Sequence, residues 1–386
     1  MKMKSKCGLP FISAALFSLL AIQSTSAFAS VQHQHRDIKI KQPRHLPHRT
    51  IFDIRGGALV NDDNNNNINA MSSSSTSSSL AAAMLNLPFT FTSSLRQTLI
   101  TGTPLHALGA LYVISSLTVV PLTWYSTAYS FSVGYGLSIA TMAMALLASF
   151  PISITTATTI LETNPSHIAT ITALIYGLRL AIFIYVREHT VESKRQQFKQ
   201  LNKTPPLKRT PLALGVSILY PLMISPVLFA LRASSGASAS ASSGSISHAI
   251  QLVSAGIAAF GMFLESIADQ HKYQVNRQNK QLPNNSTKNE TKLFVGPTTW
   301  SYKLCRHPNY LGEILHWIGL FGVGSVTFGT SPVAWISGLL GLNGILSIMF
   351  GASSRLDTKQ SEMYSGQNEY EEWKKRVPSS LIPFFK

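Results

Sequence analysis

The sequence predicts an all-α polytopic membrane protein, a bundle of about seven transmembrane helices after a removable N-terminal region. Only 12% of the 386 residues are charged and the mean hydropathy is positive, which is unusual for a soluble enzyme. After residue 100 come seven predominantly apolar runs, each near the roughly 20 residues that a helix needs to cross a hydrocarbon core. Basic residues also gather in alternate loops, which is the positive-inside pattern.

The N-terminal region predicts targeting signals. Three lysines precede the apolar stretch Leu9 to Ile22, and the small residues Ser26 and Ala27 follow it, which is the layout of a signal peptide. We assign residues 1–27 to a signal peptide and residues 28–80, with their Asn and Ser runs, to a disordered transit-like segment. The junction at Phe28 resembles the signal-to-transit boundary of proteins imported into plastids enclosed by extra membranes. The expected location is a plastid membrane or, if a lumenal tail follows an ordinary secretory signal, the endoplasmic reticulum or another endomembrane.

The transmembrane domain is predicted over residues 104–386. Small residues are frequent in its apolar runs, as close helix packing in lipid requires. The predicted spans lie near residues 104–125, 131–152, 166–186, 211–231, 246–268, 308–328 and 332–350.

The net charge of +16 follows from targeting and topology. Residues 188–210, 270–303 and 351–386 each carry six Lys or Arg residues, whereas residues 232–245 carry one and residues 329–331 carry none. This distribution predicts that the two long loops and the tail face the cytosol or stroma. It disfavours nucleic acid as a partner, so the expected partners are the lipid bilayer and a hydrophobic small molecule. The two cysteines, Cys7 and Cys305, predict neither a disulfide framework nor a metal site.

The most informative segment is residues 306–313, which read Arg-His-Pro-Asn-Tyr-Leu-Gly-Glu. Pro308 suits the first position of a helix, where its missing N–H costs nothing. Such a helix start presents free amide groups and a positive dipole end. Arg306 and His307 lie beside it, so the segment predicts a cradle for a phosphate or pyrophosphate group.

Polar residues then continue along one face of the predicted helix. Asn309, Glu313 and His316 follow at the spacing i, i+4 and i+7. A carboxylate one turn inside a membrane helix is costly unless it is paired or faces a wet cavity. Glu313 is therefore either a functional residue or one partner of an ion pair with an arginine.

The preceding helix ends with two acids one turn apart, Glu265 and Asp269. Acids at a helix C-terminus oppose the helix dipole. Compensation must come from a ligand or from a cation such as Lys272 or Arg306.

Two arginines lie eight residues apart on an otherwise apolar helix. Arg187 is close enough to the helix end to reach the membrane interface. Arg179 lies deeper, which favours a bound anion or an acidic partner such as Glu265.

The C-terminal tail combines a charged stretch, residues 369–378, with an aromatic end, residues 381–385. The first part predicts a solvated amphipathic helix. The aromatic end predicts an anchor at the membrane surface.

These residues resemble a known family. Residues 306–313, the preceding Ala268-Asp269 helix end and the tail pattern Tyr370, Val377-Pro378 and Ile382-Pro383-Phe384 resemble the steroid 5-alpha-reductase family, in particular its uncharacterised membrane relatives. The resemblance covers roughly residues 105–386.

The resemblance implies a seven-helix bundle that binds NADPH from the positive side and reduces an activated carbon–carbon double bond of a lipid, sterol or isoprenoid-like substrate. Steroid reductases polarise the substrate carbonyl with a Glu and a Tyr from early helices, but the first two predicted helices here contain no acid. We expect His316 or Tyr310 to supply the proton. By position, the implied cofactor residues are Asp269, Arg306, His307, Asn309, Tyr310 and Glu313, and with less support Arg187, Lys272, Tyr370 and Arg376.

Two alternatives remain open at the level of sequence. Isoprenylcysteine and related lipid methyltransferases, which use S-adenosylmethionine, carry a similar Arg-His-Pro segment and a similar tail. They lack a fixed acid directly after the glycine of that segment, where this chain has Glu313. The second alternative is a lipid-binding membrane protein without catalytic activity, which predicts no dependence on a nucleotide.

Overall fold

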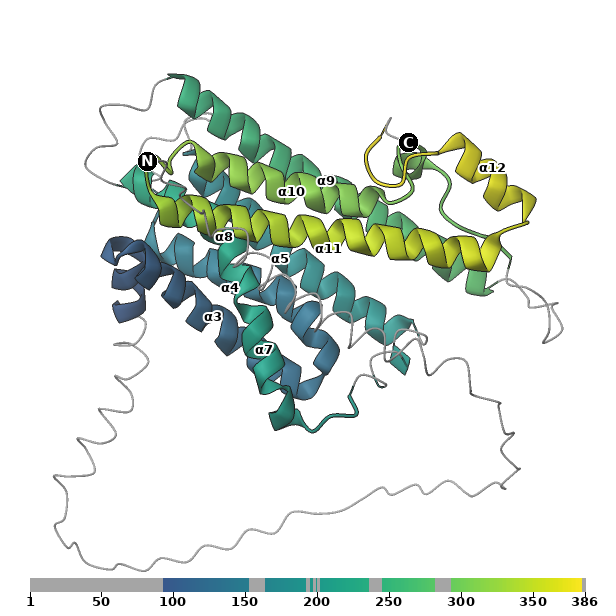
Figure 1. Ribbon diagram of the computed structural model, residues 1–386, viewed down its shortest axis with the longest axis horizontal. Helices are drawn as coiled ribbons and strands as arrows, with labels where there is room; N and C mark the ends of the chain where they lie inside the picture. The colour runs from purple at the N-terminus through teal and green to yellow at the C-terminus, as the bar shows by residue number, and fades with distance from the viewer. Residues whose placement is uncertain are drawn as a thin grey trace, which may run out of the picture. The chain divides into compact units, whose positions relative to one another are not determined.

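The computed structural model describes residues 93–152, 164–191, 195–196, 199, 202–235, 245–281 and 293–383. The predicted signal peptide and transit-like segment lie outside these residues. Within the described ranges all regular structure is helical (Figure 1), which confirms the all-α class.

A helix is present at each of the seven predicted spans. Proline occupies the first turn of α3, α5, α7, α10 and α11, where it leaves no backbone donor unpaired. Side chains of Thr103, Asn164 and Ser331 cap the first turns of α3, α5 and α11. The α-helices are α3 (Pro104–Tyr125), α4 (Val133–Ser149), α5 (Pro165–Thr190), α7 (Thr210–Ser217), α8 (Leu219–Ser235), α9 (Ser245–Gln281), α10 (Pro308–Ser325), α11 (Pro332–Tyr364) and α12 (Asn368–Arg376), and the short 3-10 helices are η1 (Thr127–Phe131), η3 (Pro206–Arg209) and η5 (Trp300–Lys303).

Five of the described helical segments are long and apolar enough to cross a membrane. They are α3, α5, the run Pro206–Ser235, α9 and α11. Of the other two predicted spans, α4 has only 17 residues, since it begins at Val133, after the 3-10 helix η1, and ends at Ser149. Helix α10 is made more polar by the residues that turn inward at its start. The chain is thus a polytopic helical membrane protein in which two of the seven predicted spans are shorter or more polar than the sequence suggested.

Three of the predicted spans also differ in extent from the helices of the structure. The span near residues 211–231 is two helices, since α7 ends before Ile218 and α8 begins at Leu219. Helices α9 and α11 continue well past their apolar runs, to Gln281 and Tyr364. No proline interrupts either extension, and charged side chains such as Arg355 on α11 remain exposed.

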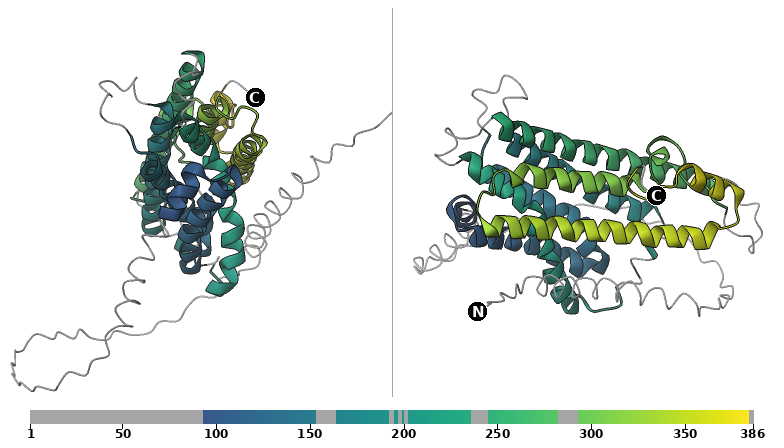
Figure 2. Two further views of the ribbon diagram at one scale, coloured as in Figure 1. Left: turned by 90° about the vertical axis from the view of Figure 1, so that its left-hand side faces the viewer. Right: turned by 45° about the horizontal axis from the view of Figure 1, so that its top comes forward.

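Glycines allow the closest helix contacts. A Cβ atom on Gly312 of α10 would lie 2.5 Å from the backbone nitrogen of Glu265 and 2.6 Å from the carbonyl oxygen of Gly261, both on α9. Helices α4 and α5 meet in the same way, because a Cβ on Gly136 would lie 2.6 Å from the carbonyl oxygen of Gly177. Such contacts suit association in lipid, where packing replaces the hydrophobic effect. Figures 1 and 2 show α9, α10 and α11 side by side, with α12 beside the C-terminal end of α11.

Candidate functional site

A buried polar cluster joins α4, α5, α9 and α10. Three carboxylates take part, and Glu265, Asp269 and Glu313 are only 3%, 8% and 7% exposed. Buried charges need partners, because removing a carboxylate from water costs several kcal/mol. The contacts of these three acids therefore define the chemistry of the cluster.

Arg179 pairs with both acids of α9. Its Nη1 donates to Glu265 Oε1 at 2.6 Å, and its Nη2 donates to Asp269 Oδ2 at 2.8 Å. Asp269 accepts a second, longer hydrogen bond from Asn309 Nδ2 at 3.3 Å. The acidic partner expected for Arg179 is thus confirmed. The two acids do not lie at a helix C-terminus as predicted, because α9 continues to Gln281. Arg179 of α5 compensates them.

Glu313 is held by hydroxyl groups. Tyr135 of α4 and Tyr176 of α5 both donate to Glu313 Oε1, at 3.0 and 3.1 Å, and the two hydroxyl oxygens lie 3.1 Å apart. No arginine forms a salt bridge with Glu313 among the described residues. Trp317 Nε1 donates to Tyr135 Oη at 2.9 Å, which fixes the ring.

His316 lies beneath this tyrosine pair. Its ring stacks on Tyr176 with centroids 4.1 Å apart, and its Nδ1 lies 3.0 Å from the carbonyl oxygen of Ala258. Its Nε2 has no hydrogen-bond partner in the described structure, and neither has Glu265 Oε2 or Asn309 Oδ1. Buried polar atoms are usually paired, so these three atoms are free to contact a polar ligand or water.

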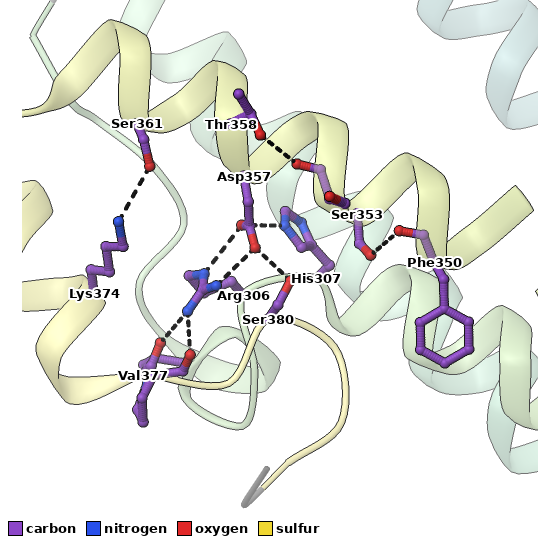
Figure 3. Close-up of polar contacts among 12 residues, drawn as sticks. Arg306, His307, Phe350, Ser353, Asp357, Thr358, Ser361, Lys374, Val377 and Ser380 are labelled. Atoms are coloured by element: carbon purple, nitrogen blue, oxygen red, sulfur yellow. Dashed lines mark hydrogen bonds and ion pairs between the residues drawn. The ribbon is translucent and has the colours of Figure 1, made fainter. Parts of the chain in front are cut away.

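A second polar cluster, which we call the clasp, fixes the start of α10 to the tail. Asp357 of α11 receives Arg306 Nη2 at 2.8 Å and lies 2.8 Å from His307 Nε2, and it accepts a hydrogen bond from the Ser380 hydroxyl. The Arg306 guanidinium also donates to the carbonyl oxygen of Val377. Figure 3 shows these contacts converging on Asp357.

Burial sets the protonation of His307, which belongs to the clasp, and of the nearby Cys305. It lowers the pKa of His307 below its ordinary value, although the Asp357 carboxylate opposes the shift. A neutral His307 ring that carries its proton on Nε2 donates to Asp357. Burial also raises the pKa of Cys305 to about 11, so its thiol stays protonated at pH 7 and is a poor nucleophile.

The clasp changes the interpretation of the tail. Backbone amides of Arg306 and His307 donate to the carbonyl oxygens of Ser379 and Ser380, both at 3.0 Å. Tyr370 and Trp373 are buried against Phe294. Residues 369–378 are therefore not a fully solvated helix, and the tail is packed against protein as far as Leu381, which is buried. Residues 384–386 lie outside the described residues.

The remaining sequence-predicted residues are spread over both clusters and beyond. Tyr310 lies beside the clasp, with its ring 5.7 Å from that of His307, and Tyr370, a residue of the tail, is buried against Phe294. Lys272 is close enough to Asp269 and Arg187 to interact electrostatically with both. Arg376 is exposed.

Within the part of the chain that the structure describes, no group of three or more His, Cys, Asp and Glu side chains is placed to hold a metal ion.

Sequence reasoning missed Tyr135, Tyr176 and Asp357 as site residues. Tyr135 stands between Gly134 and Gly136, and Tyr176 precedes a glycine; glycines beside a tyrosine indicate a face in close helix contact. Asp357 is the only acid between Glu313 and Glu362. A lone acid after a long apolar run indicates a basic partner.

We expect Asp357→Ala to open the clasp. It leaves Arg306 and His307 without their shared acceptor, and an unpaired buried donor costs about 1–3 kcal/mol. Trypsin cleavage of folded protein at residues 374–376 should therefore accelerate, by about tenfold for each 1.4 kcal/mol lost. Glu362→Gln, at an exposed position on the same helix, is the control. Equal cleavage rates of the two variants would show that the tail is held by other contacts.

Fold and site together define a helical membrane protein with a buried, carboxylate-rich polar site between two pairs of helices. A family model described as protein of unknown function (DUF1295) matches residues 137–377, which is more than half of the chain. The protein belongs to the DUF1295 family, which includes steroid 5-alpha-reductase-like proteins. Neither a curated protein nor a solved structure matches the chain.

Proposed function

We propose that this protein is a membrane-embedded reductase that uses NADPH to saturate an activated carbon–carbon double bond in a lipid, sterol or isoprenoid-like substrate. The observation that carries the proposal is the contact of two buried tyrosine hydroxyls with one carboxylate, Glu313. This arrangement supplies weak acids in a water-poor site, as protonation of a developing enolate requires. The family assignment and the motif in residues 306–313 support the same reaction class.

The residues around Asp269 suit the polar half of a nicotinamide nucleotide. Glu265 Oε2 accepts hydrogen bonds, as ribose hydroxyls offer, and Asn309 Oδ1 matches a carboxamide N–H; both are unpartnered in the described residues. Lys272 would contribute positive charge for a phosphate. Of the other sequence-predicted cofactor residues, His307, Tyr310, Tyr370 and Arg376 remain proposals of the same kind.

Arg306 fits a phosphate less directly than its place in the motif suggests. Its guanidinium is already bonded to Asp357 and to tail carbonyl groups. We therefore propose that Arg306 chiefly positions the start of α10, and with it Asn309 and Glu313, and that any phosphate contact uses what donor capacity remains.

The chain's own residues would handle the proton. NADPH, when bound, supplies a hydride to the substrate double bond. Tyr135 Oη or Tyr176 Oη would donate a hydrogen bond to the substrate carbonyl and then its proton, and Glu313, which touches both hydroxyls, would orient the pair. His316 stacks on Tyr176 and is proposed to support that ring; Tyr310, the other acid expected from sequence, lies nearer His307 than this tyrosine pair.

A methyltransferase and a lipid-binding protein remain the competing functions. The placement of Glu313 in the tyrosine cluster favours acid–base chemistry, which a methyl transfer to a thiolate or carboxylate does not need. In a lipid-binding protein, the buried arginine and its two carboxylates would have only a structural role. Nucleotide dependence separates all three functions.

The deciding measurement is thermal stabilisation of the detergent-purified protein by NADPH, NADH and S-adenosylmethionine. A ligand that binds only the folded protein raises the melting temperature with its concentration. We expect NADPH to stabilise and S-adenosylmethionine to have no effect. Asn309→Ala should weaken the NADPH effect, because it removes a polar contact without breaking the Arg179 pairs.

The matched control is Asn343→Ala, on α11 and outside both clusters. Stabilisation by S-adenosylmethionine alone would overturn the reductase proposal. Absence of any nucleotide effect would favour the lipid-binding function.

A further inference from the structure

A groove of about 380 Å³ lies between α5 and α9. Helix α5 contributes the apolar Ile182, Phe183 and Val186 together with Arg179 and Arg187, whereas α9 contributes the polar groups of Ser266, Gln270 and Tyr273. Ile182 and Val186 are exposed on the outer surface of the bundle. The groove is thus open to the bilayer along its length, unlike the buried site beside it.

The groove carries positive charge that the protein does not neutralise. Arg179 is paired with two carboxylates, but Arg187 forms no salt bridge among the described residues. The Arg187 guanidinium instead lies 5.4 Å from the centroid of the Phe183 ring. The unneutralised charge is therefore at the Arg187 end of the groove.

The groove extends from near the end of α5 into its membrane-spanning part. Arg187 lies three residues, or about 4.5 Å, before the end of α5 at Thr190. The basic residues 188–210 follow, on the side predicted to be cytosolic or stromal. Ile182 lies about 7.5 Å deeper than Arg187. A cation at the head-group level above an apolar wall is the arrangement that receives an anionic lipid.

We propose that this groove is a binding site for an anionic membrane lipid, with its phosphate or carboxylate on Arg187 and Gln270. One acyl chain would follow Ile182 and Val186 toward the bilayer centre. The site meets the buried carboxylate cluster only at Arg179, and it assigns Arg187 to lipid rather than to the nucleotide. Tyr273 closes the polar end, since its hydroxyl donates to Thr190 Oγ1 at 3.0 Å.

The test uses the full-length protein in detergent and compares phosphatidylglycerol with phosphatidylcholine of the same acyl chains. We expect phosphatidylglycerol to raise the melting temperature more than phosphatidylcholine, and inorganic phosphate to have no effect. Arg187→Gln should abolish the difference between the lipids, and Arg187→Lys should keep most of it. Arg277→Gln, which removes an exposed arginine of α9, should leave the difference intact.

A second pair of variants tests the groove without removing charge. Val186→Trp should fill the groove and abolish the phosphatidylglycerol effect, whereas Ile250→Trp, on an exposed face of α9, should not. Equal stabilisation by the two lipids, or equal losses in Arg187→Gln and Arg277→Gln, would overturn the proposal. So would stabilisation by phosphate alone, or an Arg187→Gln defect confined to NADPH. The lipid comparison needs no nucleotide, so its result is independent of the proposed reductase activity.

Discussion

Arg179→Met is expected to lower the free energy of unfolding by about 3–5 kcal/mol, because it leaves two buried carboxylates without their cation. Glu265 and Asp269 face the same guanidinium at 2.6 and 2.8 Å. Neither is exposed enough for water to replace it. The methionine keeps most of the side-chain volume, so the loss reports the charge.

Unfolding in mixed micelles with increasing SDS, followed by circular dichroism, measures this loss. Arg355→Met, at an exposed position on α11, should change stability by less than about 0.5 kcal/mol. The triple variant Arg179→Met, Glu265→Gln, Asp269→Asn should recover part of the loss, since no charge then remains unpaired. If Arg179→Met is as stable as the Arg355 variant, the carboxylates do not depend on this ion pair.

Removing both hydroxyls of the tyrosine pair should abolish most of the proposed reductase activity. Positioned general acids contribute about 100- to 10,000-fold to rate, so Tyr135→Phe with Tyr176→Phe should lower kcat by a factor in that range. The rings and their packing are retained. Stabilisation by NADPH should be unchanged, because the proposed cofactor contacts lie at Glu265 and Asn309.

The measurement is NADPH oxidation in mixed micelles with an α,β-unsaturated ketone of the sterol or isoprenoid type. The kcat of each single variant gives the contribution of the hydroxyl that it lacks. Tyr220→Phe is the control: its ring stacks on Tyr135 with centroids 5.3 Å apart, but its hydroxyl donates to the Ser130 carbonyl oxygen. Full activity of the double variant would show that the tyrosine pair takes no part in the mechanism. Loss of NADPH stabilisation would show that the substitutions act on cofactor binding or folding.

The helices were predictable because lipid imposes a length and a composition on each of them. Proline at the first turn located the starts of α5, α10 and α11 to within about a residue. The ends of α9 and α11 were not predictable from hydropathy, since a helix that leaves the apolar region continues while its charged side chains reach water. The break between α7 and α8 at Ile218 has one marker in the apolar run, Pro221 in the first turn of α8, which the predicted single span did not use.

The site was predictable in part, for a reason that separates local from distant contacts. Asn309, Glu313 and His316 share one helix, so their spacing placed them on one face. The tyrosine that donates to Glu313 from α4 is 178 residues away in sequence, and only the packing of four helices brings the two together. The pairing of Arg179 with Glu265 could be predicted because each lone charge in an apolar helix needs a partner.

The glycine contacts also have a mechanical consequence. Backbone-to-backbone packing joins α4 to α5 through Gly136 and Gly177, and α9 to α10 through Gly261 and Gly312, so the backbones within each pair are in direct contact. The tyrosine hydroxyls and Arg179 belong to the first pair, and all three carboxylates belong to the second. A hinge motion that parts the two pairs would thus break the ion pairs and withdraw the hydroxyls from Glu313 in one movement, which links admission of a ligand to the assembly of the acid groups that would act on it.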